Sequence, residues 1–316
     1  MRLNYLDYLK AFAIITVVIY HMGLGTEPIM QFLIDTQMPI FFIVSGYLTY
    51  RTGKYDPLLN SIKRAKQLIL PLLFCGIGLA LFKGVDYLTY LHTQGKLGYW
   101  FLLTLFEVSL FYNLSFSVRK MLVNKYRWII DVIMIMFLMG IRFVLPESLI
   151  EGFELRSLSK FYPMFILGIY LKEYPFIMKY IRKWNFMFIP LLIYYFCIQA
   201  PHSHLLLYYI VQVTQGCIGG LFVWYAFMIY ENNIPLKNIW SYIGQHSLEI
   251  YLVHFFLLFP AKQIMITPYF ATNLILAIIL SGSVILATLL ACSVLKTIPI
   301  IGYLFLGKTN LYKSQK

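Results

Sequence analysis

The sequence has little charge for its length, and this scarcity excludes most soluble folds. Only 12% of its 316 residues are charged, whereas 60% are hydrophobic and 18% aromatic, and the mean hydropathy is +0.73. A soluble domain carries about 25% charged residues. A chain this poor in charge cannot cover a water-facing surface, so lipid must cover most of it. The composition therefore predicts an integral membrane protein.

Signals for signal-peptide cleavage, disulfides and separate soluble domains are missing as well. The first apolar run ends in Tyr20-His21-Met22 without a small-x-small cleavage site, so we expect it to stay as a membrane span. No polar stretch is long enough for a soluble domain, and residues 1–316 are predicted to form a single membrane-embedded domain. The cysteines stand singly inside apolar runs, which favours apolar packing over disulfides or metal ligands; they are Cys75, Cys197, Cys217 and Cys292.

Long apolar runs are what the sequence has instead. A transmembrane helix needs about 20 mainly apolar residues. Ten stretches approach this requirement, and they predict an all-α, polytopic transmembrane helix bundle of about ten spans. The stretches cover residues 6–24, 33–50, 67–83, 98–117, 128–145, 159–171, 185–199, 207–230, 245–261 and 271–295.

The 26 Lys and Arg residues are unevenly divided between the two sides of this layout. With the N-terminus in the cytoplasm, 20 of them fall on the inner side and 6 on the outer side or at outer span ends. This asymmetry follows the positive-inside rule for an even number of spans with both termini cytoplasmic. Topology thus explains the net charge of +13, together with some attraction to anionic membrane lipid, and we expect no binding of nucleic acid.

Ionisable side chains inside the first span are candidates for function, because charge within a membrane is unfavourable. Lys10 and His21 are eleven residues apart, close to three turns at about 3.6 residues per turn, so both lie on one helix face about 16 Å apart along the axis. Asp7 shares this face. Lys10 also fits a charge that snorkels to the membrane edge, and a single membrane histidine is often only hydrogen-bonded within a bundle. Imidazole is nevertheless the side chain best suited to general-base work near neutral pH.

Two further features follow in the next segments. Ser45 and Gly46 place small residues in the second span, where helix backbones can approach closely. Lys63, Arg64 and Lys66 form a basic group before the third span. This group is either an orientation signal or a clamp for phosphate groups that faces the cytoplasm.

Several segments together resemble the integral-membrane acyltransferase family 3. Residues 6–10 (LDYLK) are similar to the family's L-D-x-L-R opening, and Lys10 and His21 occupy the spacing of its Arg-x10-His pattern. Residues 39–48 (PIFFIVSGYL) resemble its P-x-F-F-x-x-S-G-[FY] segment, and residues 247–254 (SLEIYLVH) its S-x-x-[IL]-Y-L-x-H helix. Further similarities lie at residues 64–71, 98–102 and 161–168. At Lys10 the charge of the family's Arg is kept, but the planar guanidinium fork is missing.

The resemblance implies a membrane O-acyltransferase. Such an enzyme moves an acyl group, here expected to be acetyl, from cytoplasmic acyl-CoA to a hydroxyl of an extracytoplasmic polysaccharide or lipid-linked glycan. The expected partners are acyl-CoA, this glycan acceptor and membrane lipid, and the expected location is the plasma membrane. Such an enzyme needs a central cavity, which the thioester of acyl-CoA would enter from the cytoplasm and the acceptor hydroxyl from the outside.

In this interpretation each candidate residue has a role. His21 is the general base that deprotonates the acceptor hydroxyl as it attacks the thioester. Asp7 and Lys10 orient the site from its inner end, and Glu107, in the middle of the fourth span, is a proton partner. The residues predicted to bind the co-substrate are Lys63, Arg64 and Lys66, which would hold the CoA phosphates, with Ser45 and Tyr47 lining the cavity.

Other polar residues in the spans have less specific interpretations. His246 and Glu249 share a helix face, but no third ligand stands at a usable spacing, so we expect no metal. His254 follows on the same span. Asp131 and Arg142 repeat the eleven-residue spacing in the fifth span, which fits a structural ion pair as well as a role in positioning substrate.

Two alternatives to an enzyme are considered. A transporter or flippase for a polysaccharide or lipid-linked sugar would also have many spans and buried charges, but no internal repeat relates the two halves of the chain. In a non-enzymatic sensor or scaffold, the alignment of Lys10 with His21 would be accidental. Acceptor-dependent release of CoA from acetyl-CoA separates the enzyme from both.

Overall fold

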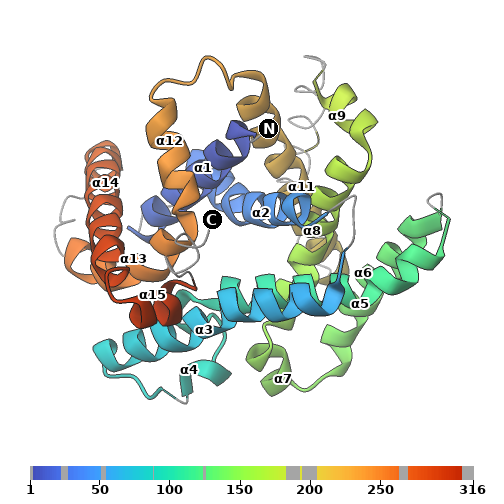
Figure 1. The fold of residues 1–316 in the computed structure, drawn as a ribbon, viewed down its shortest axis with the longest axis horizontal. Coiled ribbons are helices and arrows are strands. Elements are labelled where there is room, and N and C mark those ends of the chain that lie inside the picture. Colours follow the sequence, from blue (N-terminus) through green and yellow to red (C-terminus); the bar gives the residue numbers. More distant parts are fainter. Residues whose placement is uncertain are drawn as a thin grey trace. The chain divides into compact units, whose positions relative to one another are not determined.

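The computed structural model describes residues 3–22, 28–50, 55–87, 89–123, 126–182, 193, 205–262 and 270–307. Within these ranges the chain forms helices joined by turns and has no strand (Figure 1). The all-α prediction is therefore confirmed. Of the ten predicted spans, 185–199 lies outside the described residues apart from residue 193, and each of the others falls on a helix.

The chain divides into two compact units. The first unit contains Met1–Tyr50 and Met164–Leu290, and the second contains Arg51–Pro163 and Ala291–Lys316. The described helices of the first unit are α1 (Asn4–His21), α2 (Pro28–Thr49), α9 (Pro175–Ile181), α11 (Leu205–Ile229), α12 (Lys237–Gln245) and α13 (Ser247–Lys262). Those of the second are α3 (Pro57–Lys83), α4 (Thr89–His92), η1 (Lys96–Gly98), α5 (Trp100–Met121), α6 (Arg127–Val144), α7 (Glu147–Gly152) and α15 (Pro299–Leu306). Helices α8 (Leu155–Glu173) and α14 (Phe270–Leu295) continue from one unit into the other.

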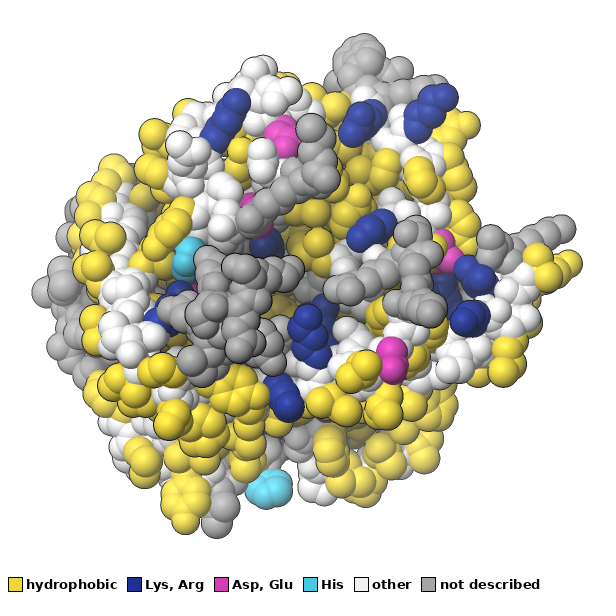
Figure 2. Space-filling model, in the orientation of Figure 1, with side chains coloured by type: hydrophobic (Ala, Val, Ile, Leu, Met, Phe, Trp, Pro, Cys, Tyr) yellow, Lys and Arg dark blue, Asp and Glu magenta, His cyan; other side chains and the backbone are white. Residues whose placement is uncertain are grey.

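Five helices in the described ranges are long and apolar enough to cross a membrane. These segments are Met30–Thr49, Pro57–Lys83, Trp100–Met121, Leu206–Ile229 and Ile275–Leu295. Hydrophobic side chains cover much of the surface in Figure 2. On α14, for example, Ile275, Ile279 and Val294 are each more than 60% exposed. Exposed apolar surface of this extent fits a lipid environment. The chain is thus a membrane protein, whereas the count of ten spans and the side of each terminus stay predictions.

Helix α3 begins earlier than the predicted third span. Asp56 caps its first turn by accepting hydrogen bonds from the backbone N–H groups of Leu58 and Leu59, and Pro57 occupies the first helical position, where its missing N–H is harmless. Gly84 ends the helix in the left-handed conformation, with φ of 67°. The basic residues predicted to precede the span therefore lie on the helix itself.

Two glycines bring α2 and α8 into close contact within the first unit. A Cβ atom on Gly46 would lie 2.0 Å from the carbonyl oxygen of Phe165, and one on Gly168 would lie 1.9 Å from that of Ile43. Neither position can hold a larger residue unless the backbones separate. Of the two small residues predicted to allow close helix approach, Gly46 does so here.

Candidate active site

A pair of histidines lies at the end of helix α1 in the first unit. His21 is the last residue of α1, and its ring centroid is 5.6 Å from that of His254 on α13. The Phe255 ring packs edge-on against His21 with a centroid distance of 5.1 Å, and the Tyr20 ring centroid is 5.4 Å from that of His21. The fold thus places two imidazoles from distant parts of the sequence side by side, within an aromatic setting.

The hydrogen bonds of His254 determine which ring nitrogen is available. His254 is completely buried, and its Nδ1 lies 2.7 Å from the carbonyl oxygen of Tyr251 and 3.0 Å from that of Ile250. Carbonyl oxygens only accept, so Nδ1 carries the proton in the neutral ring. Nε2 is then an acceptor, and it has no hydrogen-bond partner among the described residues. An orphaned buried acceptor next to a second histidine indicates a place for a proton or a polar ligand.

The inner part of α1 holds an ion pair. Lys10 Nζ lies 2.8 Å from Asp7 Oδ1, as their spacing of three residues predicts. Asp7 is only 4% exposed, and Gly244 at the end of α12 packs so closely on its backbone that a Cβ there would lie 1.9 Å from the Asp7 carbonyl oxygen. Helix α12 therefore fixes α1 at the position of this pair.

Tyr47 and Ser45 lie on the same helix, α2, in different surroundings. The Tyr47 ring packs against Trp224 of α11 at 5.2 Å, and the ammonium group of Lys172 lies 5.2 Å from the ring centroid. Ser45 is half-buried, and its carbonyl oxygen accepts a hydrogen bond from the Thr49 hydroxyl. Their predicted role as cavity-lining residues stays a prediction.

The basic group is on helix α3 of the second unit. Lys63 and Lys66 are exposed and, three residues apart, share one helix face, whereas Arg64 is half-buried. The exposed ammonium groups are accessible to an anionic ligand. Binding of CoA phosphates to this group stays a prediction.

Glu107 is buried in helix α5 of the second unit. It is 7% exposed, and its Oε2 has no hydrogen-bond partner among the described residues. The charged groups that act on it are Glu154 and Lys96, both from loops. Glu107 belongs to the second unit and the histidine pair to the first, so the structure does not assign it to the same site.

Lys96 forms the centre of a buried loop cluster. It is 1% exposed, and its Nζ donates to the carbonyl oxygens of Leu91, Thr93 and Glu151 and lies 4.0 Å from Glu154 Oε1. Burial lowers the pKa of Lys96, against the opposing effect of the nearby carboxylates. Burial raises the pKa of Glu154, although the Gly95 N–H bond and Lys96 act to lower it. The residues from Gly95 to Gly98 all have positive φ, as does Glu154, so this loop is held in a strained conformation.

Asp131 is paired with Arg119 and not with Arg142, the residue eleven positions further along the same helix. In the second unit its Oδ2 lies 3.2 Å from an Arg119 nitrogen, and both side chains are at most 4% exposed. The Arg119 guanidinium also lies over the Tyr112 ring at 5.5 Å. Asp131 therefore joins α6 to α5 instead of forming a pair with Arg142 along its own helix.

Comparison with known proteins decides the family. A family model described as an acyltransferase domain, of acyltransferase family 3, matches residues 3–293. The chain belongs to acyltransferase family 3. No curated protein and no solved structure matches it. Membership shows that this protein is an acyltransferase, and it confirms the resemblance drawn from the sequence motifs.

Sequence reasoning missed two features of this acyltransferase. In the distribution of Lys and Arg, Lys96 counts only as one of the 6 basic residues on the outer side or at outer span ends, although the flanking Gly95 and Gly98 signal a loop with positive φ. His254 was considered without a partner, because nothing in the sequence indicates that it faces His21. Among the described residues, no three His, Cys, Asp or Glu side chains are grouped to hold a metal ion.

Proposed function

We propose that this acyltransferase moves an acyl group, acetyl in the simplest case, from cytoplasmic acyl-CoA to a hydroxyl of an extracytoplasmic or lipid-linked polysaccharide at the plasma membrane. The observation that carries the proposal is the pair formed by His21 and His254. It supplies two imidazoles, one with an unpartnered Nε2, in a family that transfers acyl groups.

In the proposed reaction His21 takes the proton of the acceptor hydroxyl. The oxygen attacks the thioester carbonyl carbon, a C–O bond forms, and the C–S bond breaks with CoA thiolate as the leaving group. The proton held by His21 then passes to the thiolate, so that the products are an ester and free CoA. The neutral His254, with Nδ1 held by backbone carbonyls, presents Nε2 as an acceptor that steadies the protonated ring of His21.

Asp7 and Lys10 are proposed to orient the inner end of α1, because their ion pair lies on the face that carries His21. The basic group on α3 is proposed to hold the CoA phosphates through Lys63, Arg64 and Lys66. Replacing Arg64 and Lys66 together with Ala should then weaken binding of acetyl-CoA. A matched double variant, Lys120→Ala with Lys179→Ala, removes two exposed cations elsewhere and should bind normally. Equal acetyl-CoA affinity in the two double variants would leave the α3 group as a topology signal only.

The activity itself is tested with labelled acetyl-CoA. Purified protein should release free CoA and transfer label to polysaccharide isolated from cells that lack the protein. The surface glycan of cells with the protein should be heavier by the acyl group than that of cells without it. CoA release that does not depend on the glycan, together with unchanged glycan mass, would contradict the proposed acceptor.

A further inference from the structure

An apolar groove lies among helices α1, α12 and α14 of the first unit. Its volume is about 560 Å³. Its described lining comes from one face of each helix and is mostly apolar, with Ile15 and Ile19 on α1, Ile239 and Ile243 on α12, and Leu286 and Leu289 on α14. Tyr242 and Leu286 are more than half exposed, so the groove opens at the surface of the unit.

Ser281 is a buried polar residue of the groove. It is 1% exposed, and its hydroxyl has no hydrogen-bond partner among the described residues. A buried hydroxyl normally has a hydrogen-bond partner, since leaving it unpaired is unfavourable. The neighbouring Gly282 leaves open space, because a Cβ there would meet nothing within 4 Å. The groove thus combines room for a hydrocarbon chain with one hydroxyl that lacks its partner.

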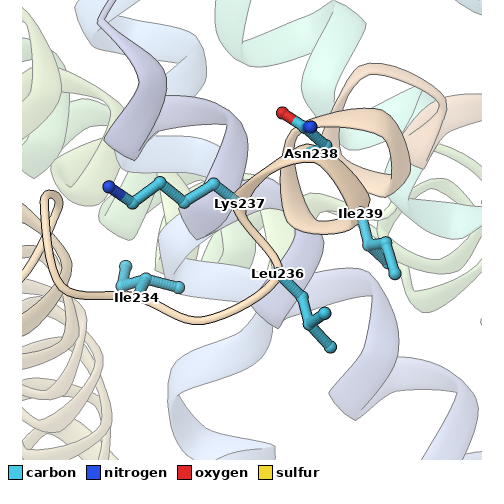
Figure 3. Close-up of a pocket in the computed structure, with 5 residues that line it drawn as sticks. All are labelled: Ile234, Leu236, Lys237, Asn238 and Ile239. Atoms are coloured by element: carbon cyan, nitrogen blue, oxygen red, sulfur yellow. The ribbon is translucent and has the colours of Figure 1, made fainter.

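A second hollow, of about 530 Å³, lies at the start of helix α12. It shares Asn238 and Ile239 with the apolar groove, so the two hollows adjoin each other at these residues. In Figure 3 the Lys237 side chain extends to the left, where Ile234 also lies, while Leu236 and Ile239 point to the right. No side chain caps this helix end, where Leu236 has φ of 55°. The first N–H groups of the helix and the Lys237 ammonium together favour an anion, and no carboxylate from the described part of the chain lines either hollow.

We propose that this combined groove is a binding site for one anionic phospholipid. The headgroup phosphate lies at the uncapped start of α12 and interacts with Lys237. An acyl chain occupies the apolar groove, and the Ser281 hydroxyl donates to an ester carbonyl of the lipid. In the predicted topology Lys237 faces the cytoplasm, so the bound lipid lies in the inner leaflet. It is therefore a different molecule from the extracytoplasmic acceptor. This site goes beyond acyl transfer and does not depend on it.

The sharpest test fills the groove. Gly282→Leu places a side chain in open space, and it should not disturb the helix because Leu is a better helix former than Gly. The control is Gly140→Leu on α6, where an added Cβ also meets nothing within 4 Å. Binding of dioleoyl phosphatidylglycerol to purified protein is titrated by native mass spectrometry. We expect at least about tenfold weaker binding for Gly282→Leu, wild-type binding for Gly140→Leu, and unchanged thermal unfolding for both.

The headgroup is tested separately with Lys237→Gln. Wild type should prefer phosphatidylglycerol to dioleoyl phosphatidylcholine by about fivefold, roughly the effect of one Lys near an anionic lipid surface, and Lys237→Gln should lose this preference. The proposal fails if Gly282→Leu binds phosphatidylglycerol like wild type or if the preference survives in Lys237→Gln. It also fails if undecaprenyl phosphate displaces the phospholipid at lower concentration, which identifies a glycan carrier site. Displacement by inorganic phosphate at a similar concentration would indicate a simple anion site instead.

Discussion

Among the described residues, the hydrogen bonds of His254 are all made by its Nδ1, and they leave Nε2 as a neutral acceptor next to His21. Because Nδ1 donates to the carbonyl oxygens of Ile250 and Tyr251, the neutral ring cannot carry its proton on Nε2 without losing those bonds. A neutral hydrogen-bond acceptor beside His21 stabilises the protonated form of His21 more than an apolar side chain in the same place would. This arrangement supports the proposal that His21 is the base and that His254 has the supporting role.

At this scale the first prediction concerns His254→Phe, which keeps a ring of similar size and removes Nε2. A hydrogen bond to a charged group contributes about 1.5–3 kcal/mol, so kcat should fall about 10- to 150-fold while KM for acetyl-CoA stays near that of wild type. Steady-state kinetics of purified protein measures both constants. The control is His246→Phe, which changes a half-buried histidine outside the pair and should be close to wild type. A His254→Phe enzyme with normal kcat would exclude the supporting role.

Among the elements, α2 and α8 are joined by backbone contact at two glycines. Gly168→Ala would place a Cβ 1.9 Å from the Ile43 carbonyl oxygen and 2.8 Å from the Tyr47 amide nitrogen. These are backbone atoms, so the helices must separate, and we expect a loss of about 1–3 kcal/mol in the free energy of unfolding. Thermal unfolding in detergent measures it. Gly140→Ala, with nothing near its Cβ, should be neutral or stabilising, and equal melting temperatures for the two variants would contradict the close contact.

The Lys96 loop gives a prediction that depends on pH. Lys96→Met removes the cation that offsets the buried Glu154, and loss of one partner of a buried pair reduces stability by about 3–5 kcal/mol. Burial already raises the pKa of Glu154, and without Lys96 it rises further. A carboxyl with a higher pKa in the folded state than in the unfolded state binds more protons when folded, so acidification stabilises the fold.

The difference in melting temperature between wild type and Lys96→Met should therefore become smaller as the pH is lowered from about 7 to about 5. Melting temperatures measured across this range test the sign. Lys83→Met, at the exposed end of α3, should show little deficit at any pH. A Lys96→Met deficit that is constant over the range would mean that Glu154 does not titrate in it.

For the whole molecule, the sequence is informative about class and much less so about contacts. Scarce charge and long apolar runs predict a helical membrane protein, because lipid imposes these properties on every span. Motif order predicts the family, and helical geometry predicts the contact of Asp7 with Lys10. The pairing of His21 with His254 and of Arg119 with Asp131 depends on how separate helices pack, which no local spacing encodes.

The topology is the prediction that belongs to this scale. The distribution of Lys and Arg predicts ten spans with both termini in the cytoplasm. A reporter that is active only in the cytoplasm, fused after Lys316, should be active. A second fusion within 202–204, predicted to lie outside between two spans, should be inactive and serves as the control. Activity of an exclusively extracytoplasmic reporter at the C-terminus would require an odd number of spans.

The most direct measurement of the central claim is the turnover of His21→Gln with labelled acetyl-CoA. Gln preserves much of the size and hydrogen bonding of His, but it cannot accept the acceptor's proton. We predict a loss of about 10²–10⁴-fold in kcat, the usual contribution of positioned proton transfer, with acetyl-CoA affinity close to that of wild type. The account is contradicted if purified His21→Gln, with a normal melting temperature, transfers label to the glycan at nearly the wild-type rate.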